Sequence, residues 1–199
     1  MTKRILILLM CWATLPGLSW AQSWEIDLSA GTSSASGGVH YRQFVETGFL
    51  KIGGTGLYHS DDDLTYRLGS FNFFMGSDTL APGLTLEVGL RGIMGTGEKK
   101  RYSGDVGNVG FAVNAEYLFS PEFFPLPIEA FGMLTYAPES LSFRDAKDYW
   151  ELTVGTGVRI GRYASVRLSY SAYNLEMETG SNDWSLNSNS LRLGMVLRF

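Results

Sequence analysis

The sequence predicts an all-β protein: an antiparallel up-and-down β-barrel that spans a membrane with about ten strands, or eight in an alternative interpretation. Apolar and polar residues alternate with a period of two along most of the chain, as in strands whose two faces meet different surroundings. The chain starts with a charged and then apolar segment, and it ends on a regular alternation that stops at Phe199. Together these observations indicate an exported barrel protein.

Residues 1–21 have the pattern of a secretory signal peptide. Lys3 and Arg4 precede the apolar run ILILLMCWATLPGL, small residues follow, and cleavage is expected after Ala21. The run is short for a membrane anchor, which needs about 20 apolar residues. Cys11 comes early and follows a large residue, which argues against a lipoprotein.

The mature part, residues 22–199, is expected to be one barrel domain. It has no cysteine, which excludes a disulfide framework, a thiolate metal site and a cysteine nucleophile. Loss of Lys3 and Arg4 changes the formal net charge from -4 to -6, whereas nucleic-acid binding needs basic surfaces. No later run reaches the roughly 18 apolar residues of a membrane helix. The 24 glycines and many aromatic residues are typical of packed β-structure.

Ten segments follow the strand period, most of them near the 9 to 11 residues of a membrane strand. They are residues 24–30, 38–45, 48–58, 64–75, 84–94, 106–119, 127–136, 149–160, 164–176 and 188–199. The early segments are weakly patterned, and omission of the first pair gives the eight-stranded alternative. Both counts leave the two termini at the same rim of the barrel.

The connections between these segments alternate in character, as in barrels with turns at one rim and loops at the other. Compact turns are expected near Glu46, at residues 161–163 and in the proline-bearing stretches SDTLAPG and SPEFFPLP. Polar loops are expected at GTSSASGG, HSDDD, GTGEKKRYSGDVG, APESLSFRDAKD and METGSNDWSLN.

Alternation alone does not tell which face is outside, because a soluble barrel would carry the polar face in water. Charges of both signs on that face favour a narrow lumen in which they pair. The expected lumen charges are Asp27, Lys51, Arg67, Glu87, Arg91, Glu116, Glu129, Glu151, Arg159, Arg167 and Arg192. Aromatic residues at both ends of the apolar face favour an outward membrane band with two belts. These belts are Trp24, Phe119 and Phe199 on the turn side, and Tyr58, Tyr136 and Trp150 on the loop side.

The last segment, SNSLRLGMVLRF, places every second residue from Leu191 to Phe199 on one apolar face. A large apolar residue at a terminus suggests a strand that is held and buried to its end. The segment resembles the C-terminal signature of bacterial outer-membrane barrels, with its alternating apolar positions and terminal aromatic residue. This resemblance implies a Gram-negative outer membrane and the barrel assembly machinery as a partner during biogenesis.

A narrower resemblance lies in GLYHSDDDLTYRLG and in YAPESLSFRDAKDYWELTVGTGVRIGRYASVRLSY. These stretches look like the YfaZ-type outer-membrane family, with a strand ending near Tyr58, an acidic turn, and a Y-x-P-E-S-L-S-F stretch before the next strand. The resemblance covers nearly all of the mature chain and implies a small outer-membrane barrel with no established activity. No functional residue can be assigned to this chain from the resemblance.

The stretch HSDDD contains the residue types of a catalytic triad, because His59, Ser60 and Asp61 are contiguous. Neighbouring strand residues point to opposite faces, so contiguous residues assemble a catalytic triad poorly. The aspartates at 61–63 lack the spaced ligands of a calcium loop. A polar turn is therefore expected here, without a catalytic or metal site.

Two other polar groups have ordinary interpretations. Residues 98–101, Glu-Lys-Lys-Arg, would form a solubilising loop, with phosphate contacts in the outer leaflet as the alternative. The stretch GTGEKKRYSG lacks the phosphate-loop pattern, so nucleotide binding is not expected. His40, with Arg42, is expected to be a hydrogen-bonded lumen residue and not a metal ligand.

The sequence therefore favours a structural or interaction barrel with a charge-paired lumen, without enzyme activity, cofactor or metal. The alternative is a narrow channel whose selectivity would reflect Arg91, Glu116 and Arg159. An envelope hydrolase is less favoured, and it would require that His59→Ala abolish the activity. The expected partners are outer-membrane lipids, lipopolysaccharide among them, with no nucleic acid and a monomeric state.

Overall fold

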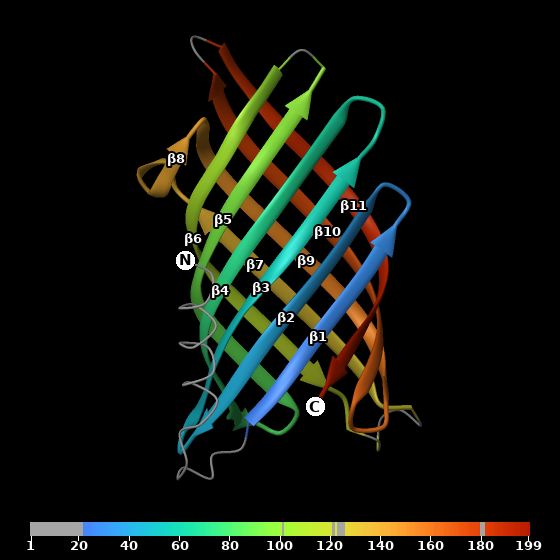
Figure 1. Ribbon diagram of the computed structural model, residues 1–199. Coiled ribbons are helices and arrows are strands. Elements are labelled where there is room, and N and C mark those ends of the chain that lie inside the picture. Colours follow the sequence, from blue (N-terminus) through green and yellow to red (C-terminus); the bar gives the residue numbers. More distant parts are fainter. Residues whose placement is uncertain (1–21, 101, 121, 123–125, 180–181) are drawn as a thin grey trace, which may run out of the picture.

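The computed structural model describes residues 22–100, 102–120, 122, 126–179 and 182–199, and the expected signal peptide lies outside these residues. Ten long antiparallel strands close into one barrel (Figure 1). They are β1 (Gln22–Gly31), β2 (Ser34–Val45), β3 (Gly48–Ser60), β4 (Leu64–Ala81), β5 (Leu84–Lys99), β6 (Tyr102–Leu118), β7 (Ile128–Ala137), β9 (Ala146–Ile160), β10 (Ala164–Thr179) and β11 (Asn182–Arg198). The predicted fold class and strand count are confirmed, and the eight-stranded alternative is wrong.

The barrel closes where the first strand pairs with the last. Glu25 of β1 lies opposite Arg198 of β11, and Trp24 and Phe199 exchange two backbone hydrogen bonds of 3.0 and 2.9 Å. The terminal strand is thus held to its last residue, as predicted. The Phe199 side chain is nevertheless 63% exposed, so the expected burial is wrong. Its ring faces outward, on the surface that a membrane would cover.

The connection after β7 has structure that the sequence did not predict. It forms a 3-10 helix (Glu139–Leu141) and the short strand β8 (Ser142–Arg144). The strand β7 pairs with β6 only as far as Phe111, so the loop-side half of β6 needs another partner. The strand β8 supplies it, with Ser142 opposite Asn108. The extra strand prevents β6 from exposing an unpaired edge there.

Most of the expected polar loops are strand. The β5 strand continues to Lys99 and β6 begins at Tyr102, while β10 reaches Thr179 and β11 begins at Asn182. The longest strand, β4, has 18 residues, well beyond the 9 to 11 or so that cross a bilayer. The wall extends on the loop side, where the β5–β6 and β10–β11 hairpins lie (Figure 1).

The two faces exchange character in this extension. On β10 and β11 the outward side chains change from Tyr170 and Leu191 to exposed polar residues such as Glu176 and Asn187. The inward side chains there become apolar and pack into a core. This core comprises Leu57, Leu64, Tyr66, Ile93, Val106, Ala137, Ala146, Tyr149, Tyr173, Leu175, Met177, Trp184 and Leu186. Such an arrangement is that of a water-soluble barrel, in which apolar groups leave water by pointing inward.

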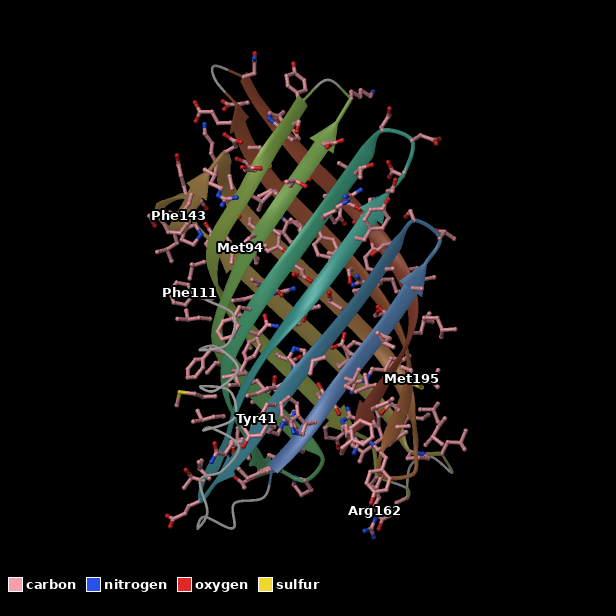
Figure 2. All side chains as sticks on the ribbon, viewed as in Figure 1. Tyr41, Met94, Phe111, Phe143, Arg162 and Met195 are labelled. Atoms are coloured by element: carbon pink, nitrogen blue, oxygen red, sulfur yellow. The ribbon has the colours of Figure 1, made fainter. Side chains whose placement is uncertain are left out.

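Below this extension the outer surface is a continuous apolar band. Met94, Phe111 and Met195 project from it in Figure 2, with exposed fractions of 63%, 58% and 41%. Five of the six expected belt aromatics are exposed on the outer surface, and Phe119 is half-buried against Tyr117. An outward apolar band on a wall without open edges makes this a membrane-spanning barrel. Within the described residues, no helix is long and apolar enough to cross a bilayer.

The exchange of faces predicts unequal effects at two adjacent positions of β11. Leu186 points into the core and is 3% exposed, so Leu186→Ala should lower the free energy of unfolding by about 2–5 kcal/mol. Asn187 points outward, and Asn187→Ala should change it by less than about 0.5 kcal/mol. Urea unfolding of the refolded barrel in micelles, followed by tryptophan fluorescence, measures both. Equal losses would show that this part of β11 has the opposite orientation.

The charged lumen as candidate functional site

The turn-side half of the lumen contains a continuous network of ion pairs. It joins side chains from nine strands, because inward positions on neighbouring strands are brought together when the sheet closes. Its members are Glu25, Arg42, Lys51, Glu87, Glu116, Glu129, Arg159, Arg167 and Arg198.

Glu129 on β7 is the most deeply buried acid of this network, with no exposed surface. The Nε of Arg167 donates to it at 2.5 Å and the Nη2 of Arg159 at 3.1 Å. The same two arginines donate to Glu116 at 2.6 and 2.9 Å. Each carboxylate therefore accepts from both cations. Charge-assisted hydrogen bonds of this kind compensate the cost of removing charges from water.

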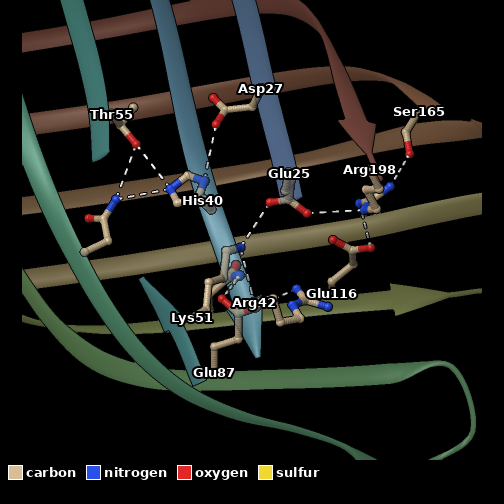
Figure 3. Close-up of polar contacts among 12 residues, drawn as sticks. Glu25, Asp27, His40, Arg42, Lys51, Thr55, Glu87, Glu116, Ser165 and Arg198 are labelled. Atoms are coloured by element: carbon tan, nitrogen blue, oxygen red, sulfur yellow. Dashed lines mark hydrogen bonds and ion pairs between the residues drawn. The ribbon is translucent and has the colours of Figure 1, made fainter. Parts of the chain in front are cut away.

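Arg198 connects this group to the opposite wall. It donates to Glu116 at 3.3 Å and to Glu25 at 3.2 Å, and Figure 3 shows Glu25 between Arg198 and Lys51. Lys51 lies 3.1 Å from Glu25 and 3.6 Å from Glu87, which also pairs with Arg42 at 3.0 Å. The chain of contacts crosses the lumen and ties its walls together.

His40 is a hydrogen-bonded lumen residue, as predicted. Its Nε2 lies 3.3 Å from the Nδ2 of Asn72 and 3.5 Å from the Oγ1 of Thr55, and its Nδ1 lies 3.6 Å from Asp27 (Figure 3). No group of three or more potential ligands surrounds a metal position in the part of the chain that the structure describes.

A second charged group lies between the ion-pair network and the apolar core. Arg91 pairs with Glu151, which also accepts a hydrogen bond of 2.7 Å from the Tyr149 hydroxyl. Arg192 donates to the hydroxyls of Ser171 and Tyr173. Among the described residues, no carboxylate lies within ion-pair distance of Arg192, although it is only 6% exposed.

Little space remains among these side chains. One cavity of about 200 Å³ is bordered by both charged groups, Lys51 and Glu87 on one side and Arg91 and Arg192 on the other. Glu87 and Glu151 are each 2% exposed. The lumen is therefore filled by side chains over most of its length.

All the expected lumen charges except Arg67 point inward. Arg67 lies on the outer surface, with its guanidinium carbon 5.7 Å from the centre of the Tyr58 ring, so its predicted place is wrong. The reason is that Leu64, Tyr66 and Leu68 occupy the inward positions of β4 near its loop-side end.

Sequence reasoning missed two members of the ion-pair network. Glu25 alternates with Trp24 and Ile26, and Arg198 alternates with Leu197 and Phe199. The period of two already places both with the polar face. They lie at the ends of their strands, where the choice between strand and terminus is least certain from the sequence.

The stretch HSDDD forms a turn and not a triad. His59 is 1% exposed and points inward, whereas Ser60 bonds to Thr65 at 3.3 Å. Asp61 approaches the Nε2 of His59 at 3.2 Å, and the Ser188 hydroxyl lies 3.3 Å from Nε2 and 3.5 Å from Nδ1. The His59 ring also stacks on Tyr66, with the ring centroids 4.8 Å apart.

Asp61 organises the turn between β3 and β4. Its Oδ1 accepts from the backbone N–H groups of Asp63 and Leu64 at 3.1 and 2.9 Å. Burial acts to raise the pKa of Asp61, but the hydrogen bonds from His59 and from these two N–H groups outweigh it and lower the pKa. The ionised form is thus favoured in the folded protein.

The expected charge-rich loop at residues 98–101 is partly strand, because Glu98 belongs to β5 and Lys100 lies in the turn that follows it. Lys99 ends β5 and donates to the backbone oxygen of Ser185 at 2.7 Å. Lys100 has a positive φ of 55° and pairs with Asp63 at 3.4 Å. Arg101 lies outside the described residues. Lys99 and Lys100, two of the cations expected to contact phosphates, therefore bind groups of the chain itself.

No protein family model matches the chain, and no curated protein matches it. Solved structures resemble it at low identity. The translocator domain of the autotransporter NalP from Neisseria meningitidis aligns over 100% of this chain and 95% of that chain, with a TM-score of 0.45 and 12% identity. The porin NanC aligns over 89% of this chain and 99% of that chain, with a TM-score of 0.43 and 11% identity. OmpT of Vibrio cholerae, described as outer-membrane expressed, aligns over 90% of this chain and 96% of that chain. The TM-score is 0.35 and the identity is 9%.

The network predicts a large cost for the loss of one buried charge. Glu129→Gln leaves Arg159 and Arg167 facing a neutral group, and the free energy of unfolding should fall by about 3–5 kcal/mol. The exposed Glu98 provides the matched control, and Glu98→Gln should change it by less than about 0.5 kcal/mol. Urea unfolding in micelles measures both. A loss for Glu129→Gln as small as for the control would mean that the network does not stabilise the barrel.

The turn predicts a pH dependence. Because the pKa of Asp61 is lowered by folding, its carboxylate stabilises the folded protein above the unfolded pKa, and this contribution is lost as pH falls through the folded pKa. Asp61→Asn should lower the melting temperature at about pH 7 and have little effect below about pH 3. Asp62→Asn, at the exposed neighbour in the same turn, should have little effect at either pH. Equal effects of Asp61→Asn at both pH values would contradict this role.

Proposed function

We propose that this protein is a small outer-membrane barrel with a structural or interaction role and a closed lumen. The observation that carries the proposal is the burial of the lumen charges, since Glu87, Glu129 and Glu151 are at most 2% exposed. An aqueous pore would leave such groups in contact with water. Here hydrogen bonds from arginine and tyrosine take the place of water.

The apolar core supports the same proposal. It occupies the loop-side half of the barrel, where Ile93, Leu175 and Leu186 are each at most 3% exposed. A conducting path would have to cross both this core and the ion-pair network. Neither half of the lumen offers hydrated walls to an ion.

We also propose a Gram-negative outer membrane as the location, export through the periplasm, and kinship with the YfaZ-type family. Support comes from the signal pattern of residues 1–21 and from the terminal strand that ends on Phe199. The proposed partners are outer-membrane lipids and, during biogenesis, the barrel assembly machinery, with a monomer as the mature state. We assign no catalytic residue.

A narrow channel is the second candidate, because the lumen contains a cavity of about 200 Å³ with charged walls. Small solutes would need to displace or move between Lys51, Arg91 and Arg192. The lumen charges would then set selectivity.

Single-channel recording of the refolded protein in a planar bilayer separates the two candidates. Folding is first established by heat-shifted gel mobility, and a porin in the same bilayer serves as the positive control. The closed lumen predicts no openings above the baseline. Reproducible openings from folded protein would overturn the closed lumen and favour the channel.

A further inference from the structure

A shallow apolar groove of about 560 Å³ crosses the outer surface of β1 to β5. The floor follows one row of paired residues, in which Gly37 lies opposite Gly56 and Gly56 opposite Gly69. Leu28 and Met94 end the row on either side. The groove thus exists because three adjacent strands lack a side chain at the same level.

Packing within the chain does not require glycine at the centre of this row. A Cβ atom at Gly56 would lie 3.9 Å from its nearest neighbour, and one at Gly69 would lie 3.8 Å away. Both distances are ordinary van der Waals contacts. By contrast, a Cβ at Gly89 or Gly155 would come within 2.0 or 2.4 Å of other atoms. Those glycines are needed by the fold, whereas Gly56 and Gly69 are not.

Glycine in a strand interior loses more conformational freedom on folding than alanine does, and it marks places where another molecule approaches the backbone closely. On the outer surface of a barrel that lies in a membrane, the molecule available for such an approach is a lipid. An apolar groove without side chains on its floor suits an acyl chain. The flanking Leu28 and Met94 offer apolar walls to it.

The positively charged side chain of Arg67 lies at the loop-side end of the groove. Arg67 lies in the next row, opposite Tyr58 and Thr96, and both Arg67 and Tyr58 border the groove. Tyr58 belongs to the aromatic belt, so the guanidinium lies at the level of lipid headgroups.

Three other cations near this rim pair with carboxylates of the chain. Among the described residues, Lys100, Arg144 and Lys147 each pair with a carboxylate, whereas the contact shown for Arg67 is the face of Tyr58. A guanidinium in this position matches a phosphate group geometrically and electrostatically.

We propose that this groove binds one phosphorylated, multiply acylated lipid of the outer leaflet, with an acyl chain over Gly56 and Gly69 and a phosphate at Arg67. The inference rests on the proposed function only in placing the loop-side rim at the outer leaflet. It does not depend on whether the lumen conducts.

Native mass spectrometry of the full mature barrel in micelles, titrated with bisphosphorylated lipid A, tests this site. Wild-type protein should retain one lipid. Arg67→Gln should weaken retention by about fivefold, the contribution expected of one cation at a lipid surface. Gly69→Leu should weaken it by about tenfold, because the added side chain fills the floor of the groove.

Matched controls exist on the same molecule. Arg162, an exposed arginine at the opposite rim (Figure 2), supplies Arg162→Gln. Gly132 of β7, where a Cβ would meet its nearest atom at 3.7 Å, supplies Gly132→Leu away from the groove. Neither control should reduce retention. Gly69→Ala fits without a clash, so it should fold as wild type does and reduce retention less than Gly69→Leu.

Several results would overturn the site. One is the absence of retained lipid on folded wild-type protein, and another is equal retention by Gly69→Leu and Gly132→Leu. A wild-type dimer that Gly69→Leu dissociates would assign the groove to a second copy of the chain instead. Conductance of the same folded samples is recorded separately, so that failure of the closed lumen and failure of the lipid site are distinguished.

Discussion

The burial of ionised side chains inside a closed wall is the constraint on which the rest of this barrel depends. Closure satisfies the backbone, since every long strand has a partner on both sides. It also forces the inward side chains of opposite walls together, where they must compensate one another. Glu116 and Glu129 do so by sharing Arg159 and Arg167, and Arg198 extends the contacts to the first strand. The same contacts that stabilise the lumen fill it.

The outer surface of the barrel wall faces lipid in one part and water in another. In the apolar band the outside is lipid, and the charged side chains lie inside. In the loop-side extension the outside is water, so Leu175, Met177 and Leu186 turn inward and form a core. The strand backbone and its hydrogen bonds continue unchanged through the transition. The barrel therefore has a lipid-facing part and a water-facing part built from the same strands, and the inward side chains differ in kind between the two.

The glycines of the barrel wall divide into two kinds. Some glycines admit no side chain because a neighbouring strand lies too close, as at Gly89. Others, such as Gly56 and Gly69, leave an open groove beside Arg67, whose guanidinium lies over the Tyr58 ring. The first kind serves the fold, and the second kind offers a surface to the membrane. Glycine content alone does not separate them.

The sequence by itself determined the strand period, the antiparallel closed barrel, the outward aromatic belts and nearly all the lumen charges, because a period of two assigns each residue to a face. It did not reveal that the faces exchange beyond the membrane band, so Arg67 was assigned to the wrong side and polar strand ends were taken for loops. Pairing partners such as Glu129 with Arg167, and the cross-wall contact of His59 with Ser188, needed the tertiary structure. Register and closure set these contacts, and both depend on residues that are distant along the chain.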